Sequence, residues 1–115
     1  MKINKNLDSM LLACGLRDNL TGTEYARRAI MMYEPGMSIG KEVYPAIAAA
    51  YGTRSSCVER AMRHAIESGF QRCGYDDEVM TMFGNTINPG SGKPTNSEFV
   101  ARLARLYREG LTGAN

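Results

Sequence analysis

The chain lacks any long run of apolar residues, although 43% of its 115 residues are hydrophobic. A membrane-spanning helix needs about 20 consecutive apolar residues, so none is expected. The N-terminal segment MKINKNLD has lysines but no apolar core behind them, so it does not resemble a secretory signal. We therefore expect a cytoplasmic protein with a single domain over residues 1–115 and an ordered core over about 7–108.

The chain also has few residues that bind metals or form disulfides. Its three cysteines, Cys14, Cys57 and Cys73, lie far apart and include no C-x-x-C pair. This pattern argues against a disulfide framework and against a zinc site. Cys14 falls on an apolar stripe and is expected in the core. Cys57 falls at a helix start, where it is either a redox switch or an inert small residue.

No catalytic constellation is recognisable. His64 is the single histidine, and it stands beside arginines rather than near a nucleophile or further metal ligands. The segment PGSGKPT, residues 89–95, lacks the glycine spacing of a phosphate-binding loop, and no strand is expected before it. The acidic residues 76–78 suit a helix N-terminus better than a cation site. The sequence thus predicts a protein that is not an enzyme and that needs no cofactor or metal.

Apolar residues recur at helical spacing along the chain, and no segment shows the alternation of a strand. We predict an all-α, six-helix domain with a central helix-turn-helix. Three S/T-x-x-E pairs, beginning at Thr21, Ser56 and Thr95, have the spacing of capping boxes. Pro45 conflicts with a continuous third helix, so we expect a bend there, the alternative being a shorter helix that starts at Pro45. The expected helices span about residues 7–14, 21–33, 38–50, 56–70, 76–83 and 95–110.

The segment from Tyr44 to Phe70 organises this arrangement. It predicts two helices joined by a glycine turn, and the second helix has one apolar face. The opposite face carries Arg60, Arg63, His64 and Glu67, and is mostly basic. In a helix-turn-helix the second helix enters the DNA major groove, where its outward residues reach base edges. A plain helical hairpin fits the same pattern, but a merely solvated face more often mixes charges of both signs.

Four motifs resemble one family: YPAIAAAYG at 44–52, VERAMRHAIE at 58–67, FGNT at 83–86 and KPTNSEF at 93–99. Together they look like the C-terminal effector domain of the sporulation master response regulator, the stage zero sporulation protein A family. The likeness extends from residue 7 to about 108. It implies a sequence-specific, DNA-binding transcription regulator whose copies sit in tandem or as a homodimer on DNA.

The resemblance also implies roles for individual residues. The helix with V-E-R-A-x-R-H reads a promoter box in the major groove, and the segment after it contacts the sigma subunit of RNA polymerase. Lys93 would lie near the phosphate backbone, and Arg54 and Ser56 are expected to contact phosphates as well. The base-contacting set carried over is Glu59, Arg60, Arg63 and His64. The sigma-contacting set carried over is Tyr75, Asp76, Asp77, Glu78 and Met82.

Either Arg60 or Arg63 is expected to make the bidentate contact with guanine O6 and N7. Glu59 could accept a hydrogen bond from cytosine N4, unless a capping box holds its carboxylate. The motifs depart from the family at two positions, since Cys57 stands where an arginine is usual and Phe70 where a tryptophan is usual. The first change removes one expected DNA contact.

The family regulator also has an N-terminal receiver domain, and these 115 residues contain no such α/β unit. The chain is therefore expected to be either an isolated effector fragment or a stand-alone relative. Its net charge is only +2, and this value by itself does not indicate a DNA-binding protein. The alternative function is a non-catalytic protein-interaction module that retains the fold but has lost specific DNA reading.

Overall fold

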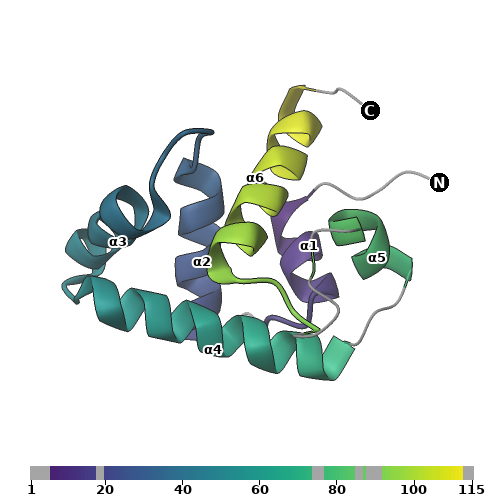
Figure 1. Ribbon diagram of the computed structural model, residues 1–115, viewed down its shortest axis with the longest axis horizontal. Coiled ribbons are helices and arrows are strands. Elements are labelled where there is room, and N and C mark those ends of the chain that lie inside the picture. Colours follow the sequence, from purple (N-terminus) through teal and green to yellow (C-terminus); the bar gives the residue numbers. More distant parts are fainter. Residues whose placement is uncertain (1–5, 18–19, 74–76, 85–86, 88–91, 113–115) are drawn as a thin grey trace.

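The longest helix, α4 (Ser55–Cys73), forms one side of the molecule (Figure 1). The computed structural model describes residues 6–17, 20–73, 77–84, 87 and 92–112. Over these residues the chain forms six α-helices, one π-helical turn and no strand, so the predicted all-α fold is confirmed. The remaining elements are α1 (Leu7–Ala13), α2 (Thr21–Met32), the π-helical turn η1 (Ile39–Val43), α3 (Tyr44–Tyr51), α5 (Asp77–Phe83) and α6 (Asn96–Thr112).

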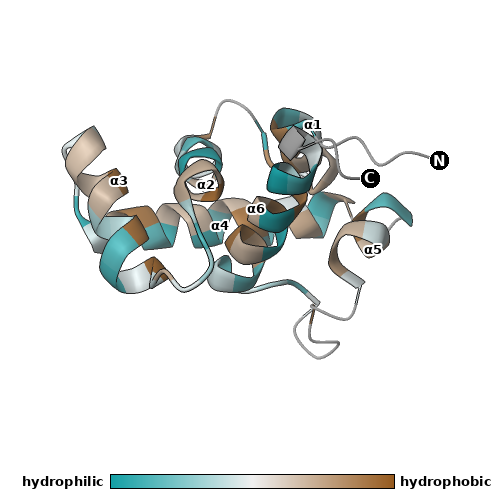
Figure 2. Cartoon of the chain, turned by 90° about the horizontal axis from the view of Figure 1, so that it is seen from above, coloured by the Kyte–Doolittle hydropathy of each residue, from teal (hydrophilic) through white to brown (hydrophobic). Residues whose placement is uncertain are grey.

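The other helices are arranged along α4. Helices α2 and α6 rise from the middle of α4, α3 lies at its start, and α1 and α5 lie toward its end (Figure 1). Seen from above, α2, α4 and α6 each carry both hydrophilic and hydrophobic residues (Figure 2). Such helices bury their apolar faces against one another and leave their polar faces in water.

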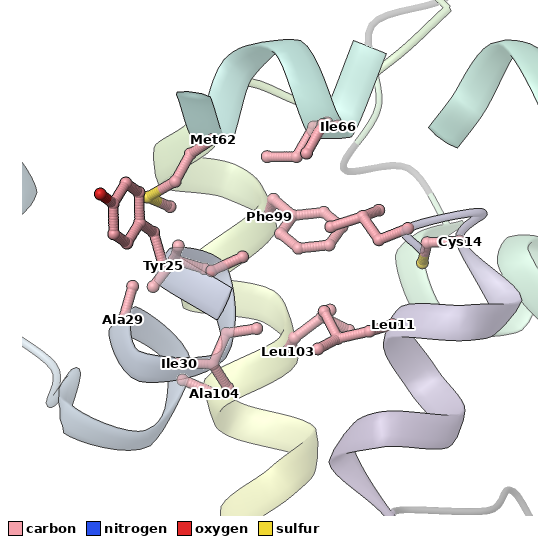
Figure 3. Packing of buried hydrophobic residues seen from close by; sticks show 14 of the residues in the cluster. Leu11, Cys14, Tyr25, Ala29, Ile30, Met62, Ile66, Phe99, Leu103 and Ala104 are labelled. Carbon is pink, nitrogen blue, oxygen red and sulfur yellow. The ribbon is translucent and has the colours of Figure 1, made fainter. Parts of the chain in front are cut away.

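A hydrophobic core fills the space between α4 and the helices above it. Figure 3 shows Met62 and Ile66 pointing from α4 toward Tyr25 of α2 and Phe99 of α6, with Leu11 of α1 on the far side. All five side chains are buried. The buried face of α4 consists of Val58, Met62, Ala65, Ile66, Gly69 and Phe70. This face follows the predicted stripe, so the opposite face of α4 points outward.

Two glycines allow helix backbones to approach closely. A Cβ atom at Gly22 in α2 would lie 2.1 Å from the carbonyl oxygen of Ala61 in α4. A Cβ atom at Gly69 in α4 would lie 2.6 Å from the carbonyl oxygen of Cys14, after α1. Contacts this short are repulsive, so only glycine fits at either crossing. Helices α1 and α2 are thereby held directly against the inner side of α4.

One of the three predicted capping boxes forms. The Thr95 hydroxyl accepts a 3.1 Å hydrogen bond from the Glu98 N–H, and the Glu98 carboxylate accepts one of 2.9 Å from the Thr95 N–H. The other two predictions are wrong, because α2 begins at Thr21 and α4 begins at Ser55. Thr21 and Ser56 therefore lie inside the first helical turn, and their hydroxyls do not cap these helices.

The bend expected at Pro45 is a change of helix type. The helical backbone is continuous from Ile39 to Tyr51, but its first turn is π-helical, and α3 starts at Tyr44 with Pro45 in its first turn. Proline lacks an N–H and crowds the carbonyl group four residues earlier, and a wider turn relieves this conflict. The predicted alternative was a shorter helix that starts at Pro45. Helix α3 is close to it and starts one residue earlier, at Tyr44.

Helix α4 continues beyond its predicted end at Phe70, as far as Cys73. An Arg72 guanidinium N–H donates a 2.6 Å hydrogen bond to the Gly15 carbonyl oxygen. This bond ties the last turn of α4 to the end of α1 and favours the longer helix. Helix α6 likewise continues past Gly110 to Thr112.

Cys14 is buried as predicted, Cys57 is exposed and Cys73 is partly buried. Among the described residues, no three His, Cys, Asp or Glu side chains are grouped so that they could hold a metal ion. None of the helices within the described segments combines the length and the apolar character that a bilayer-spanning helix requires.

Candidate nucleic-acid interface

Helices α3 and α4 are joined by a turn of three residues that begins with Gly52 and ends with Arg54. Gly52 adopts a left-handed conformation, with φ +67°, and its N–H and that of Thr53 both donate to the Ala48 carbonyl oxygen. This cap depends on glycine and closes α3 within one residue. The Arg54 carbonyl oxygen then accepts hydrogen bonds of 3.0 Å from the N–H groups of residues 57 and 58, which starts α4.

The outward face of α4 carries the predicted base-contacting residues. All four lie on it: Glu59, Arg60, Arg63 and His64. Three are exposed and Glu59 is partly buried. Their spacing places them in two neighbouring rows that cover about one and a half turns of helix. Two of the predicted phosphate-contacting residues, Arg54 and Ser56, are exposed where this face begins.

The third predicted phosphate contact, Lys93, precedes α6 in sequence but lies beside α4. Its Nζ is 3.8 Å from Oε2 of Glu67. A hollow of about 400 Å³ separates this part of α4 from residues 93–97. On the α4 side of the hollow, Nη1 of Arg63 is 3.7 Å from Oε2 of Glu59. The Glu59 carboxylate therefore lies beside Arg63 and does not cap the helix.

Asn96 fixes the segment that carries Lys93, and sequence reasoning did not identify this role. Its buried amide group donates hydrogen bonds of 3.0 Å to the Tyr44 hydroxyl and to the Glu59 carbonyl oxygen. Burial raises the pKa of the Tyr44 hydroxyl, and the Asn96 hydrogen bond partly opposes this effect. One side chain thus joins the first turns of α3 and α6 to α4. A polar residue at a helix start normally indicates exposure, so the sequence pattern gave no signal of burial.

Several arginines away from this face are bound to the protein's own groups. Arg27 pairs with carboxylates of α1 and α2. Arg102 and Arg108 on α6 donate hydrogen bonds to the backbone carbonyl oxygens of Met82 and Tyr33, the latter at 2.7 Å. These guanidinium groups hold helices together and are not available to a ligand.

Arg54 and Arg60 differ from these arginines. Within the described part of the chain, neither guanidinium is hydrogen-bonded or paired with a carboxylate, and both are exposed. They flank the exposed thiol of Cys57. A hydrogen bond from the Thr53 hydroxyl lowers the pKa of Cys57, and the backbone at Arg54 and the charges of Arg54 and Arg60 act in the same direction.

The predicted sigma-contacting set is only partly at the surface. Tyr75 and Asp76 lie outside the described residues. Asp77 and Glu78 are exposed in the first turn of α5. Met82 is fully buried, so its assignment to a contact surface is wrong. The exposed methionine of α5 is Met80, which is 49% exposed, as expected for the opposite side of the helix.

The helical fold and the family match together identify a DNA-binding effector domain. Residues 7–106 match the family described as "Sporulation initiation factor Spo0A C terminal", and the chain belongs to this family. The match covers the whole span from α1 through most of α6, including the α3–α4 pair and the Lys93 segment. The resemblance inferred from the four motifs is thereby confirmed.

Proposed function

We propose that the domain is a sequence-specific transcription regulator in which α3 and α4 form the helix-turn-helix. In this proposal α4 enters the major groove of a promoter box, and its outward residues reach the base edges. The base-contacting residues are Glu59, Arg60, Arg63 and His64. Binding to DNA would place the domain at the nucleoid or in the surrounding cytoplasm.

The observation that carries this proposal is the division of the arginines. Away from α4, Arg27, Arg102 and Arg108 are held by carboxylates or carbonyl oxygens of the same chain, whereas Arg17, after α1, is exposed and has no such partner among the described residues. Arg54 and Arg60 are exposed and unpaired within the described residues, and Arg63 is 53% exposed. Retaining unsatisfied or weakly paired guanidinium groups on one helix face favours a nucleic-acid ligand over a purely structural role.

Three further residues are suited to the phosphate backbone. Arg54 and Ser56 stand where α4 begins, and Lys93 stands beside the same helix at the edge of the hollow. Such contacts position a protein on the duplex without reading its sequence, and they make affinity fall with salt. The proposed interface thus has base-reading residues on α4 with phosphate contacts on both flanks.

Fluorescence anisotropy with two labelled duplexes tests this function. One duplex carries the family's promoter box and the other carries the same bases in scrambled order, each at low and near-physiological salt. We expect at least about tenfold tighter binding to the box at both salts. Equal and steeply salt-dependent binding of both duplexes would contradict sequence reading and favour a protein-interaction module. Binding stoichiometry from the same titrations tests whether copies bind in tandem.

Helix α5 is the proposed contact for the sigma subunit of RNA polymerase, through Asp77, Glu78 and Met80 in place of Met82. An apolar side chain beside two exposed carboxylates suits a partner surface with basic and apolar residues. Replacing Met80 by serine should leave DNA affinity unchanged and weaken, by about fivefold or more, recruitment of sigma-containing polymerase to the promoter complex.

The matched control is Leu12→Ser, because Leu12 is an apolar residue of α1 that is 66% exposed. It removes a similar surface on another helix and should leave recruitment unchanged. Polymerase recruitment that is the same for Met80→Ser and the wild type would exclude Met80 from the contact.

A further inference from the structure

Two carboxylates stand among the cations of the proposed DNA-binding face. Glu59 lies one turn before Arg63 and Glu67 lies one turn after it, so the three side chains form one row along α4. The Glu67 carboxylate is directed across the hollow to Lys93, with 3.8 Å between Oε2 and Nζ. The Glu67 side chain is 45% exposed and the Lys93 side chain 37%, so a DNA phosphate can reach the ammonium group of Lys93.

The segment that carries Lys93 is held in place independently of Glu67. Pro94 is buried, Thr95 forms the capping box of α6, and Asn96 is bonded to α3 and α4. Lys93 is therefore presented at a fixed position beside α4. The ion pair with Glu67 is one contact that the ammonium group must give up or share to face a ligand.

We propose that Glu67 holds Lys93 in the free domain and thereby limits the affinity of the domain for every duplex, without reading sequence. This inference rests on the proposed function, in which α4 and Lys93 face DNA. A phosphate oxygen and the Glu67 carboxylate compete for the same ammonium group. Binding of any duplex must break or share this ion pair and bring a carboxylate close to the backbone charge.

Glu59 occupies a corresponding position but cannot have the same effect. Its carboxylate is 3.7 Å from the guanidinium of Arg63, which is proposed to read a base. A change at Glu59 would therefore alter binding differently for different sequences. Glu67 pairs with a phosphate-contacting lysine, so a change there acts on all sequences alike.

Replacing Glu67 by glutamine tests this role, because glutamine keeps the size and helix propensity of the side chain. Anisotropy titrations at low salt should show binding about three- to fivefold tighter for both the box and the scrambled duplex, the range expected for an exposed ion pair. The slope of log affinity against log salt should become steeper by up to about 0.9, since one more cation then neutralises phosphate.

The matched control is Glu109→Gln, which changes net charge equally and removes an ion pair whose carboxylate is similarly exposed. Glu109 lies near the end of α6, with Oε2 3.4 Å from Nε of Arg105 and 39% of its side chain exposed. Helix α6 leads away from α4 (Figure 1), so this variant should change affinity by less than about twofold.

A second test places Glu67→Gln in a Lys93→Met background. The gain in affinity should be clearly smaller there, because the lysine that Glu67 holds is absent and only the repulsion between the Glu67 carboxylate and the backbone charge is relieved. An undiminished gain in this background, or no gain from Glu67→Gln alone, would overturn the inference. The proposed function fails separately, if the wild-type domain shows no preference for the box.

Discussion

Replacing Gly22 by alanine is expected to lower the free energy of unfolding by about 3 kcal/mol. The new Cβ would lie 2.1 Å from the carbonyl oxygen of Ala61 and 2.9 Å from Cβ of Ala65. A backbone carbonyl in the middle of α4 cannot turn away as a side chain could. Helix α2 must therefore move outward by roughly an ångström and loosen the core that it shares with α4 and α6.

Alanine also favours the helix by up to about 1 kcal/mol over glycine, but this gain offsets only part of the clash. The net loss is a large fraction of the free energy of unfolding of a typical domain, which is about 5–15 kcal/mol. Urea unfolding followed by far-UV circular dichroism measures it, because the chain has no tryptophan for fluorescence.

The control for this prediction is Gly40→Ala in the π-helical turn. A Cβ atom at Gly40 would have no neighbouring atom within 4 Å. This variant should be neutral or more stable by up to about 1 kcal/mol. If Gly22→Ala unfolds at the same urea concentration as the wild type, the close crossing of α2 and α4 is wrong.

The comparison of these glycines shows what sequence pattern can and cannot predict. Apolar residues at helical spacing predicted six helices and the buried face of α4, because burial of one face is a local property of each helix. Which helices cross closely depends on their relative positions. Gly22 and Gly40 look alike in the sequence, yet only Gly22 lies against another backbone.

Helix starts and short helices show a second limit. An S/T-x-x-E pair caps a helix only if its first residue is the N-cap, and α2 and α4 begin too early for Thr21 and Ser56 to fill that position. Helix α5 has only seven residues, and four of them have large apolar side chains. So short a helix does not show from its sequence which of these side chains face inward. The resemblance placed the inward Met82 in the contact set, and the periodicity of so short a helix could not distinguish it from the outward Met80.

The candidate interface on α4 also combines features that the sequence predicts with features that it does not. The row of residues 59–64 on α4 follows from local helical spacing, so the motif placed it correctly on the outer surface. The contacts of Asn96 and the pairing of Glu67 with Lys93 join segments far apart in the chain. Local pattern contains no information on such contacts, although they decide how the cations are presented.

Replacing Arg63 by alanine should weaken binding to the promoter box by about 5- to 150-fold and reduce discrimination against the scrambled duplex. A bidentate contact between arginine and guanine contributes about 1–3 kcal/mol of discrimination, which corresponds to this range of affinity. Binding of the scrambled duplex should fall only by the few-fold expected from losing one cation. The anisotropy titrations described above measure both effects.

The fold should be unaffected, because Arg63 is 53% exposed and its ion pair with Glu59 spans 3.7 Å at the surface. Exposed i, i+4 pairs contribute only about 0.3–0.5 kcal/mol. The control is Arg105→Ala on α6, which removes the same charge and an i, i+4 pair of 3.4 Å while leaving α4 intact. It should lower affinity for both duplexes by less than about twofold.

Arg54→Ala provides the opposite comparison, because it removes a proposed phosphate contact. This loss should lower affinity for both duplexes by similar factors and make the slope of log affinity against log salt shallower by about 0.9. The pattern across the three variants therefore separates base reading from charge. A preference for the box that survives Arg63→Ala unchanged would exclude Arg63 as a base reader. The bidentate contact would then belong to Arg60, the other exposed arginine of the α4 face.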